Sequence, residues 1–218
     1  MVSIYEPIKA QCRVTDTVIV SFSGGKDSVV TLDLCHRYFK TVHAFFMYQV
    51  PGLSFQEAAL RYAEKRYGIE IMRIPHFGLS DMMRYGAFRQ EDPLVGLVKI
   101  IDIYTWVRLQ FDCWWISAGE RISDSIVRRA MMKRSGSIDD KRGRFYPVSL
   151  FNKNDVMRYI DHHKLKISPE FHVLGSSAGC LAPKEMFLIK KHYPEDFKKI
   201  ANFFPFIEAS VGKYEMTL

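Results

Sequence analysis

Two adjacent glycines between an apolar run and an amphipathic segment limit the folds open to this chain. The run Thr17-Val18-Ile19-Val20-Ser21-Phe22 is rich in β-branched residues and predicts a buried strand. The loop Ser23-Gly24-Gly25-Lys26-Asp27-Ser28 follows, and residues 28–39 carry apolar side chains at helical spacing. Glycines let an oxygen approach the backbone closely, and a helix start presents unpaired amides. A strand, glycine loop and helix in this order therefore predict an anion site.

The polar residues of this loop suit a phosphate. Ser23 and Ser28 can add hydroxyl donors, and Lys26 adds a positive charge. Asp27 is a poor partner for phosphate, so we expect it to hold magnesium or to cap the helix. The loop is not a Walker A loop, which has four residues between its first glycine and Gly-Lys, and Ser or Thr after the lysine. The predicted phosphate site comprises the end of the strand and the loop: Ser21, Phe22, Ser23, Gly24, Gly25, Lys26, Asp27 and Ser28.

Predicted strands and helices alternate along the chain. After the first strand, strands are predicted at 42–48, 69–74, 113–118 and, more briefly, 145–148. Further helices are predicted at 54–67, 94–111 and, capped by Asn154, 155–163, whereas 75–93 reads as irregular. This alternation is typical of an α/β fold with a parallel, doubly wound, Rossmann-like sheet and helices on both faces. We expect one domain over 1–218, with a core at about 14–165 and a small helical or irregular C-terminal part at about 166–218.

A second polar segment follows the fourth predicted strand. It runs from Gly119 through Arg121 and Ser125 to Arg128. Arginine offers planar, permanently charged forks that suit phosphate and sulfate oxygens. Arg121 and Arg128 are seven residues apart, so on one helical run they would share a face. Since ligands of such sheets bind beyond the carboxyl ends of the strands, this segment and the glycine loop should lie at the same edge.

The net charge and the cysteine content indicate which partners and which cellular compartment suit the chain. The net charge of +7 and the pI near 9.2 suit an anionic partner such as a nucleotide, a nucleic acid or a sulfate ester, or simply serve solubility. The four cysteines, Cys12, Cys35, Cys113 and Cys180, form no CxxC pair, so no zinc ribbon or iron–sulfur cluster is expected. Few cysteines in a chain with ample core indicate a reducing, cytoplasmic setting. No apolar run is long enough for a membrane span, and no signal peptide is recognised.

The chain resembles a known superfamily. Ser-Gly-Gly-x-Asp-Ser after a first strand is similar to the PP-loop of the adenine nucleotide alpha-hydrolase superfamily, which has an HUP-type fold and includes ATP pyrophosphatases and the sulfonucleotide (PAPS) reductases. The segment 119–128 resembles the Gly-x-Arg-x-x-acid/amide-Ser-x-x-Arg pattern of the reductase branch. The stretches 146–160 and 168–180, with Gly175 and Gly179-Cys180, resemble that branch's later motifs. The resemblance implies that the loop holds phosphate or sulfate groups of an adenine nucleotide.

The chain also departs from the reductase pattern. Sulfonucleotide reductases carry a nucleophilic cysteine near the C-terminus, whereas here the tail 211–218 holds none. Cys180 is the last cysteine, and its neighbours Leu181, Ala182 and Pro183 do not supply the further cysteines that iron–sulfur members have. Cys180 could act as a sulfur-carrying thiol, although packing of a loop is the preferred interpretation.

These observations favour an enzyme that binds ATP with magnesium. It would let an acceptor oxygen attack the alpha-phosphate, releasing pyrophosphate and adenylylating the acceptor. The expected catalytic set is Lys26, Asp27, Arg121 and Arg128, with Gly119 and Ser125 among the nucleotide contacts. Three alternatives stay open: a sulfonucleotide reductase or sulfur-transfer component, a nucleic-acid thiolation or modification component, and a non-catalytic nucleotide sensor. The basic run 133–144 is interpreted as a loop that closes over an anionic substrate, contacts nucleic acid or is simply exposed. The acceptor or sulfur-donor partner is unidentified, and a homodimer is an open alternative.

Overall fold

The computed structural model describes residues 3–175 and 181–217. Within them, six strands form one sheet in the order β3-β2-β1-β4-β6-β5. All neighbouring strands run parallel except β5 and β6. The predicted α/β fold with a doubly wound, mostly parallel sheet is therefore confirmed. The strands are β1 (Thr17–Ser21), β2 (Thr41–Tyr48), β3 (Ile71–Pro75), β4 (Ile116–Ser117), β5 (Ile138–Asp139) and β6 (Arg144–Phe145).

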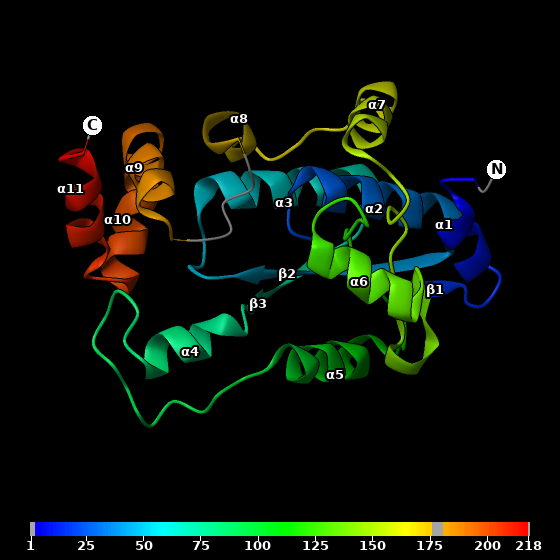
Figure 1. The fold of residues 1–218 in the computed structure, drawn as a ribbon, viewed down its shortest axis with the longest axis horizontal. Helices are drawn as coiled ribbons and strands as arrows, with labels where there is room; N and C mark the ends of the chain where they lie inside the picture. Colours follow the sequence, from blue (N-terminus) through cyan, green and yellow to red (C-terminus); the bar gives the residue numbers. More distant parts are fainter. Residues whose placement is uncertain (1–2, 176–180, 218) are drawn as a thin grey trace.

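Helices cover both faces of the sheet (Figure 1). One layer holds α1, α2, α3 and α7, and the opposite layer holds α4 and α5. The described helices are α1 (Glu6–Gln11), α2 (Lys26–Tyr38), α3 (Ser54–Tyr67), α4 (Gly78–Arg84), α5 (Ile100–Phe111), α6 (Ile126–Ser135), η1 (Asp140–Arg142), α7 (Lys153–His163), α8 (Glu170–Leu174), α9 (Pro183–His192), α10 (Pro194–Phe203) and α11 (Ile207–Glu215).

The central strand β1 explains why the first apolar run is not amphipathic. Val18 and Val20 pack into the core cluster that includes residues of α2 and α7. Ile19 points to the other face and packs with Tyr104 and Val107 of α5. All three β1 residues are fully buried, as expected for a parallel strand that is covered on both faces. Burial of each such side chain contributes about 1.5–3 kcal/mol, so the position of β1 is strongly determined.

The C-terminal helices form a separate apolar cluster against the sheet domain. Ile189 and Phe197 of α9 and α10 are buried together with Phe55 of α3. Asp196 is buried, and its carboxylate accepts a hydrogen bond from the backbone N–H of Ser54 at 2.9 Å. The first turn of α3 is thus joined to α10 by both apolar and polar contacts.

Several predicted element bounds are wrong. The helix predicted at 94–111 begins only at Ile100, and the stretch predicted as irregular contains α4. The strand predicted at 113–118 is reduced to β4, and the one at 145–148 is replaced by β6, which pairs with the unpredicted β5. Asn152, not Asn154, caps α7, because its side chain accepts from Asp155 N while the Asp155 side chain accepts from Asn152 N.

The structure contains no membrane-spanning candidate among the residues it describes, since none of their helices is both long and apolar enough.

Candidate functional site

The glycine loop lies at the carboxyl end of β1 and leads directly into α2. Gly24 has φ of +76°, a left-handed conformation that side chains rarely adopt, and Gly25 is the N-cap of α2. No side chain caps this helix. Because the first N–H groups of a helix have no partner within it, the start of α2 offers donors and a partial positive charge to an anion.

The two serines of the loop, Ser23 and Ser28, form hydrogen bonds with each other. The Ser28 hydroxyl donates to the Gly25 carbonyl oxygen at 2.9 Å and accepts from the Ser23 N–H at 3.2 Å. The Ser23 hydroxyl lies 3.1 Å from the same Ser28 oxygen. Ser28 is buried, whereas Ser23 is exposed. Ser28 therefore fixes the shape of the loop, and Ser23 remains the serine that a ligand can reach.

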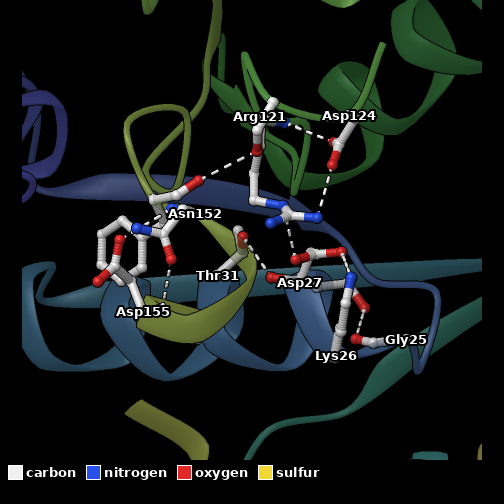
Figure 2. A network of polar contacts seen from close by, with 11 residues as sticks. Gly25, Lys26, Asp27, Thr31, Arg121, Asp124, Asn152 and Asp155 are labelled. Carbon is white, nitrogen blue, oxygen red and sulfur yellow. Dashed lines mark hydrogen bonds and ion pairs between the residues drawn. The ribbon is translucent and has the colours of Figure 1, made fainter. Parts of the chain in front are cut away.

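Figure 2 shows a charge network behind the loop. The Asp27 carboxylate is contacted by the Lys26 ammonium and by Arg121, whose Nε lies 2.9 Å from Asp27 Oδ1. Arg121 is only 7% exposed, and its Nη2 also contacts Asp124 Oδ1 at 2.6 Å. The expectation that Asp27 caps α2 is wrong, because this side chain makes no capping bond. Its oxygens face two cations, and a magnesium role for it stays untested.

The two predicted arginines do not share a helical face. Arg121 precedes α6, which begins at Ile126, and it is buried between Asp27 and Asp124. Arg128 lies within α6, and its Nη1 contacts Glu120 Oε1 at 2.6 Å. The prediction failed because Ser125 starts a new helix: its side chain accepts a hydrogen bond from Arg128 N at 3.1 Å. Ser125 is thus a helix cap in this structure.

Gly119 brings the end of β4 against the start of α2. A Cβ atom at this position would lie 3.0 Å from the backbone carbon of Asp27 and 3.0 Å from the backbone nitrogen of Ser28. Backbone atoms cannot move aside as a flexible side chain can, so only glycine fits without a shift of α2. The two predicted segments therefore do meet at one sheet edge, and Gly119 is the point of contact.

A cavity of about 640 Å³ opens in front of the loop. Four cationic side chains reach it, Lys26, Arg128, Arg144 and Lys153, and its other lining residues include Ser23, Gly25, Gly119, Glu120, Tyr104 and Phe171. Arg121 does not line it, so its contact with a ligand would be indirect. Glu120, Lys153 and Phe171 lie within motifs that the sequence suggested but were given no role. Arg144 ends the basic run 133–144 that the sequence suggested as a nucleic-acid contact, whereas Tyr104 carries no sequence signal.

A second, apolar cavity of about 200 Å³ adjoins the first. The two share Ser21, Ser23 and Met47, and the second is lined further by Phe22, Phe46, Val50, Leu53 and Phe55. Residues of α9 and α10, Met186, Ile189 and Ile200, close its far side. Of the two predicted nucleotide contacts at the end of β1, Ser21 therefore lines both cavities, whereas Phe22 lines only the second, more apolar one.

Two of the described cysteines, Cys35 and Cys113, are not placed as reactive thiols, whereas Cys12 is partly exposed. Cys35 is fully buried, and burial raises its pKa to about 12, so the thiol is protonated at neutral pH. Burial also raises the pKa of Cys113. Within 3–175 and 181–217, no three His, Cys, Asp or Glu side chains gather as a metal site. Cys180 and Gly179 lie outside the described residues.

A glycine loop that carries β1 into an uncapped helix, at the carboxyl edge of a parallel sheet, defines a PP-loop nucleotide-binding fold. The model of the phosphoadenosine phosphosulfate reductase domain matches residues 17–183. The chain belongs to this family, within the PP-loop ATP pyrophosphatase superfamily. No curated protein sequence matches the chain.

Two solved structures share the fold. The chain is similar to the phosphoadenylyl-sulfate (PAPS) reductase from Candida auris, in a phosphate complex, with 16% identity and a TM-score of 0.54, over 80% of this chain and 85% of that one. It is also similar to the U34-tRNA thiolase NcsA from Methanococcus maripaludis, with 17% identity and a TM-score of 0.50, over 93% of this chain and 78% of that one.

The second likeness corrects the cofactor expectation. The sequence was taken to exclude an iron–sulfur cluster, but NcsA, which has the same fold, is described with its [4Fe-4S] cluster. Exclusion by cysteine spacing is therefore wrong as a rule for this fold, because ligands that are distant in sequence can meet in space. The described cysteines of this chain do not assemble such a donor set.

Proposed function

We propose that the protein is an enzyme that binds ATP through the glycine loop and cleaves it at the alpha-phosphate, transferring the adenylyl group to an acceptor. The observation that carries this proposal is the start of α2. It has no side-chain cap, it faces a cavity of about 640 Å³, and cationic side chains line that cavity. Unpaired amides, a helix dipole and nearby cations together suit a polyphosphate.

The two adjoining cavities suggest how the nucleotide lies. The polar cavity takes the phosphates on the amides of the loop, and the apolar cavity beside Phe22 and Phe46 takes the base. Ser21, Ser23 and Met47 line both, so the sugar would pass over them. Lys26 contacts Asp27 in this structure, and a phosphate would compete for its ammonium group.

The reaction needs charge neutralisation and alignment more than side-chain chemistry. An acceptor oxygen attacks the alpha-phosphorus, the bond from phosphorus to the bridging oxygen breaks, and pyrophosphate leaves with the electron pair. The proton of the acceptor passes to solvent. The start of α2 and Lys26 would stabilise the charge on the departing pyrophosphate. Arg121 acts as a positioning residue, because it holds Asp27 and thereby the first turn of α2.

Family membership favours a second candidate, a sulfonucleotide ligand such as PAPS. The same loop suits either polyanion. Reduction of a sulfonucleotide requires an activated thiol, and burial raises the pKa values of Cys35 and Cys113, whereas Cys180 lies outside the described residues. We place ATP cleavage first because of the helix start and the cationic cavity, and PAPS enters as a competing ligand in the test.

Calorimetric titrations with ATP, PAPS and PAP test the proposal on the wild type, Lys26→Ala and a control, Lys40→Ala. Lys40 is exposed and pairs with Asp16 away from the loop, so its loss should change nothing. We expect ATP to bind about tenfold more weakly to Lys26→Ala alone. Pyrophosphate release in the presence of candidate acceptors then identifies the reaction. Preference for PAPS and PAP over ATP, or equal ATP affinity in both variants, would overturn the proposal.

A further inference from the structure

Most of the excess positive charge lies on one short segment. Residues 126–144 contain seven Lys and Arg residues against two Asp, a net charge of +5, in a chain whose total is +7. The segment consists of α6, the turn through β5 and η1, and the start of β6. Such concentration is not needed for solubility, which an even distribution would serve equally well.

The seven cations of this segment fall into three groups, one of which is Arg142 alone, paired with Asp139 at 3.7 Å. Arg128 and Arg144 turn inward, and both contact Glu120 Oε1, at 2.6 and 3.3 Å. Four others are exposed and have no ion pair with the described residues: Arg129, Lys133, Arg134 and Lys141. The inward pair belongs to the nucleotide cavity, so the four outward cations have no role in the proposed reaction.

An open groove of about 950 Å³ runs between α6 and the turn. Arg134, Lys141 and Arg142 line it together with Asp139 and Asp140 and with apolar residues such as Val127 and Ala130, whereas Arg129 and Lys133 are exposed on α6 outside this lining. α6 separates this groove from the nucleotide cavity, because Arg128 on the same helix lines that cavity. A ligand in the groove would therefore lie next to the nucleotide.

An exposed aromatic ring lies beside the same turn. Trp114 is 50% exposed, and the Arg108 guanidinium stacks 4.2 Å from its ring centre. Arg108 also donates to the Arg142 carbonyl oxygen at 2.5 Å, and a Cβ on Gly143 would lie 2.5 Å from the indole. Trp114 is thus held against the basic turn with Arg108 over its ring, and its remaining exposed surface is one on which a base can stack.

We propose that this surface, comprising Arg129, Lys133, Arg134, Lys141 and Trp114, binds a single-stranded nucleic acid. Cations without partners beside an exposed, fixed aromatic ring fit a phosphate backbone whose bases are free to stack. A membrane surface fits less well. A membrane-binding basic helix presents a broad apolar face, whereas α6 exposes only Ile126 and Val127 as large apolar residues, and the groove beside it is concave.

The binding itself does not depend on the proposed function. If ATP cleavage also holds, the nucleic acid is placed as the class of acceptor, because α6 borders both the groove and the nucleotide cavity. The two claims have separate readouts, since oligonucleotide binding and ATP binding are measured independently.

Fluorescence anisotropy with labelled 20-nucleotide RNA and DNA single strands tests the proposal. Four to five phosphate contacts predict a slope of log affinity against log salt of about −3. The triple variant Arg129→Glu, Lys133→Glu, Lys141→Glu should bind at least about 30-fold more weakly, with a slope nearer zero by about 2. A matched control changes three exposed lysines elsewhere: Lys65→Glu, Lys184→Glu, Lys191→Glu. It carries the same net charge and should retain nearly all of the affinity.

Trp114→Ala separates stacking from charge. It should lower affinity roughly tenfold and leave the salt slope unchanged. ATP titrations of the triple variant report whether the nucleotide site is intact, and thermal unfolding reports folding. Equal loss in the two triple variants, no binding of either strand at 50 mM salt, or binding of vesicles with 30% anionic lipid in place of oligonucleotides would overturn the proposal. Preference for RNA or DNA identifies the natural form of the ligand.

Discussion

Helices α2 and α6 begin at the same edge of the sheet, but the backbone N–H groups of their first turns have different partners. At the start of α6, the Ser125 hydroxyl accepts a hydrogen bond from Arg128 N, and the helix faces solvent. At the start of α2, no side chain caps the helix, and the neighbouring groups are glycines and a buried serine. The capped start of α6 has one of its free N–H groups occupied by Ser125, whereas the uncapped start of α2 keeps its N–H groups for a ligand in the cavity. The comparison indicates which helix start binds the anion.

Some other helix starts are closed by side chains, whereas α1, α4, α8, α9, α10 and α11 also have no side-chain cap, and α2 differs from these in following the glycine loop at the charged cavity. The Asn152 side chain caps α7, and Asp196, from a distant helix, accepts from the first N–H of α3. The uncapped start of α2 is positioned by two other contacts. Arg121 forms an ion pair with Asp27, and Gly119 packs closely against the backbone of Asp27 and Ser28. An open helix start therefore depends on support that does not use its amides.

The largest effect should come from removing that support at Arg121. Its guanidinium is 7% exposed and contacts Asp27 and Asp124, so its removal takes away a largely buried cation and its contacts with two partly exposed carboxylates. We expect Arg121→Ala to lower the free energy of unfolding by about 3 kcal/mol. Urea denaturation measures this. Arg128→Ala is the control, since that side chain is half exposed and its ion pair should contribute less than about 1 kcal/mol. Similar losses in the two variants would contradict the difference drawn between these arginines.

Asp196 should come next. Its carboxylate accepts from Ser54 N–H and hydroxyl and from Lys199, so Asp196→Ala should cost about 2–3 kcal/mol and loosen α10 from α3. Burial opposes the charged form, but these hydrogen bonds outweigh it and hold the pKa of Asp196 below its ordinary value.

The sign of the pH dependence follows from that lowered pKa. The stabilisation that ionised Asp196 gives the folded state is fully present above the pKa of an aspartate in the unfolded chain, about 3.9. It is lost as the pH falls through the lower pKa of Asp196 in the folded state. Denaturation curves between pH 3 and 6 should show a smaller acid loss in Asp196→Asn than in the wild type. An identical profile would mean that this carboxylate does not carry the contact.

Gly119→Ala should have an intermediate effect. The new methyl group would meet backbone atoms of α2 at 3.0 Å and displace the loop, which should cost about 1–3 kcal/mol and weaken ATP binding. Gly212→Ala is the control, because nothing lies within 4 Å of its Cβ position in α11, and it should stabilise slightly. Thermal unfolding and calorimetry measure the two effects. If Gly119→Ala changed neither stability nor ATP binding, close packing of Gly119 against the backbone of α2 would not position that helix.

The smallest expected loss of stability, in Ser125→Ala, tests whether the start of α2 or the start of α6 binds the phosphate. Ser125→Ala removes the cap of α6 and should cost about 1 kcal/mol without changing ATP affinity. Ser28→Ala removes the bonds that shape the loop and should weaken ATP binding. Parallel titrations of the two variants give the answer. Loss of ATP affinity in Ser125→Ala would place the phosphate at α6 instead.

The sequence was sufficient for the elements that local chemistry determines. The β-branched run 17–22 and the glycine loop were read correctly because burial and backbone freedom are local properties. Arg121 was misplaced, since its role depends on Asp27, which is brought near only by the pairing of β4 with β1. The signals for Ser125 and Asn152 as caps were present, although a continuous helix and Asn154 were preferred. The apolar cavity could not be foreseen, because Ile189 and Ile200 close it from about 130 residues beyond Phe55.

The central claim is that the amides at the start of α2 hold the phosphates. Amide NMR spectra of the labelled protein test it during titration with ATP, pyrophosphate and adenosine. ATP and pyrophosphate should both shift the amide signals of Gly25, Lys26 and Asp27, whereas adenosine should shift only residues of the apolar cavity such as Phe22. Shifts confined to α6, or no response of residues 25–27 to pyrophosphate, would contradict the account.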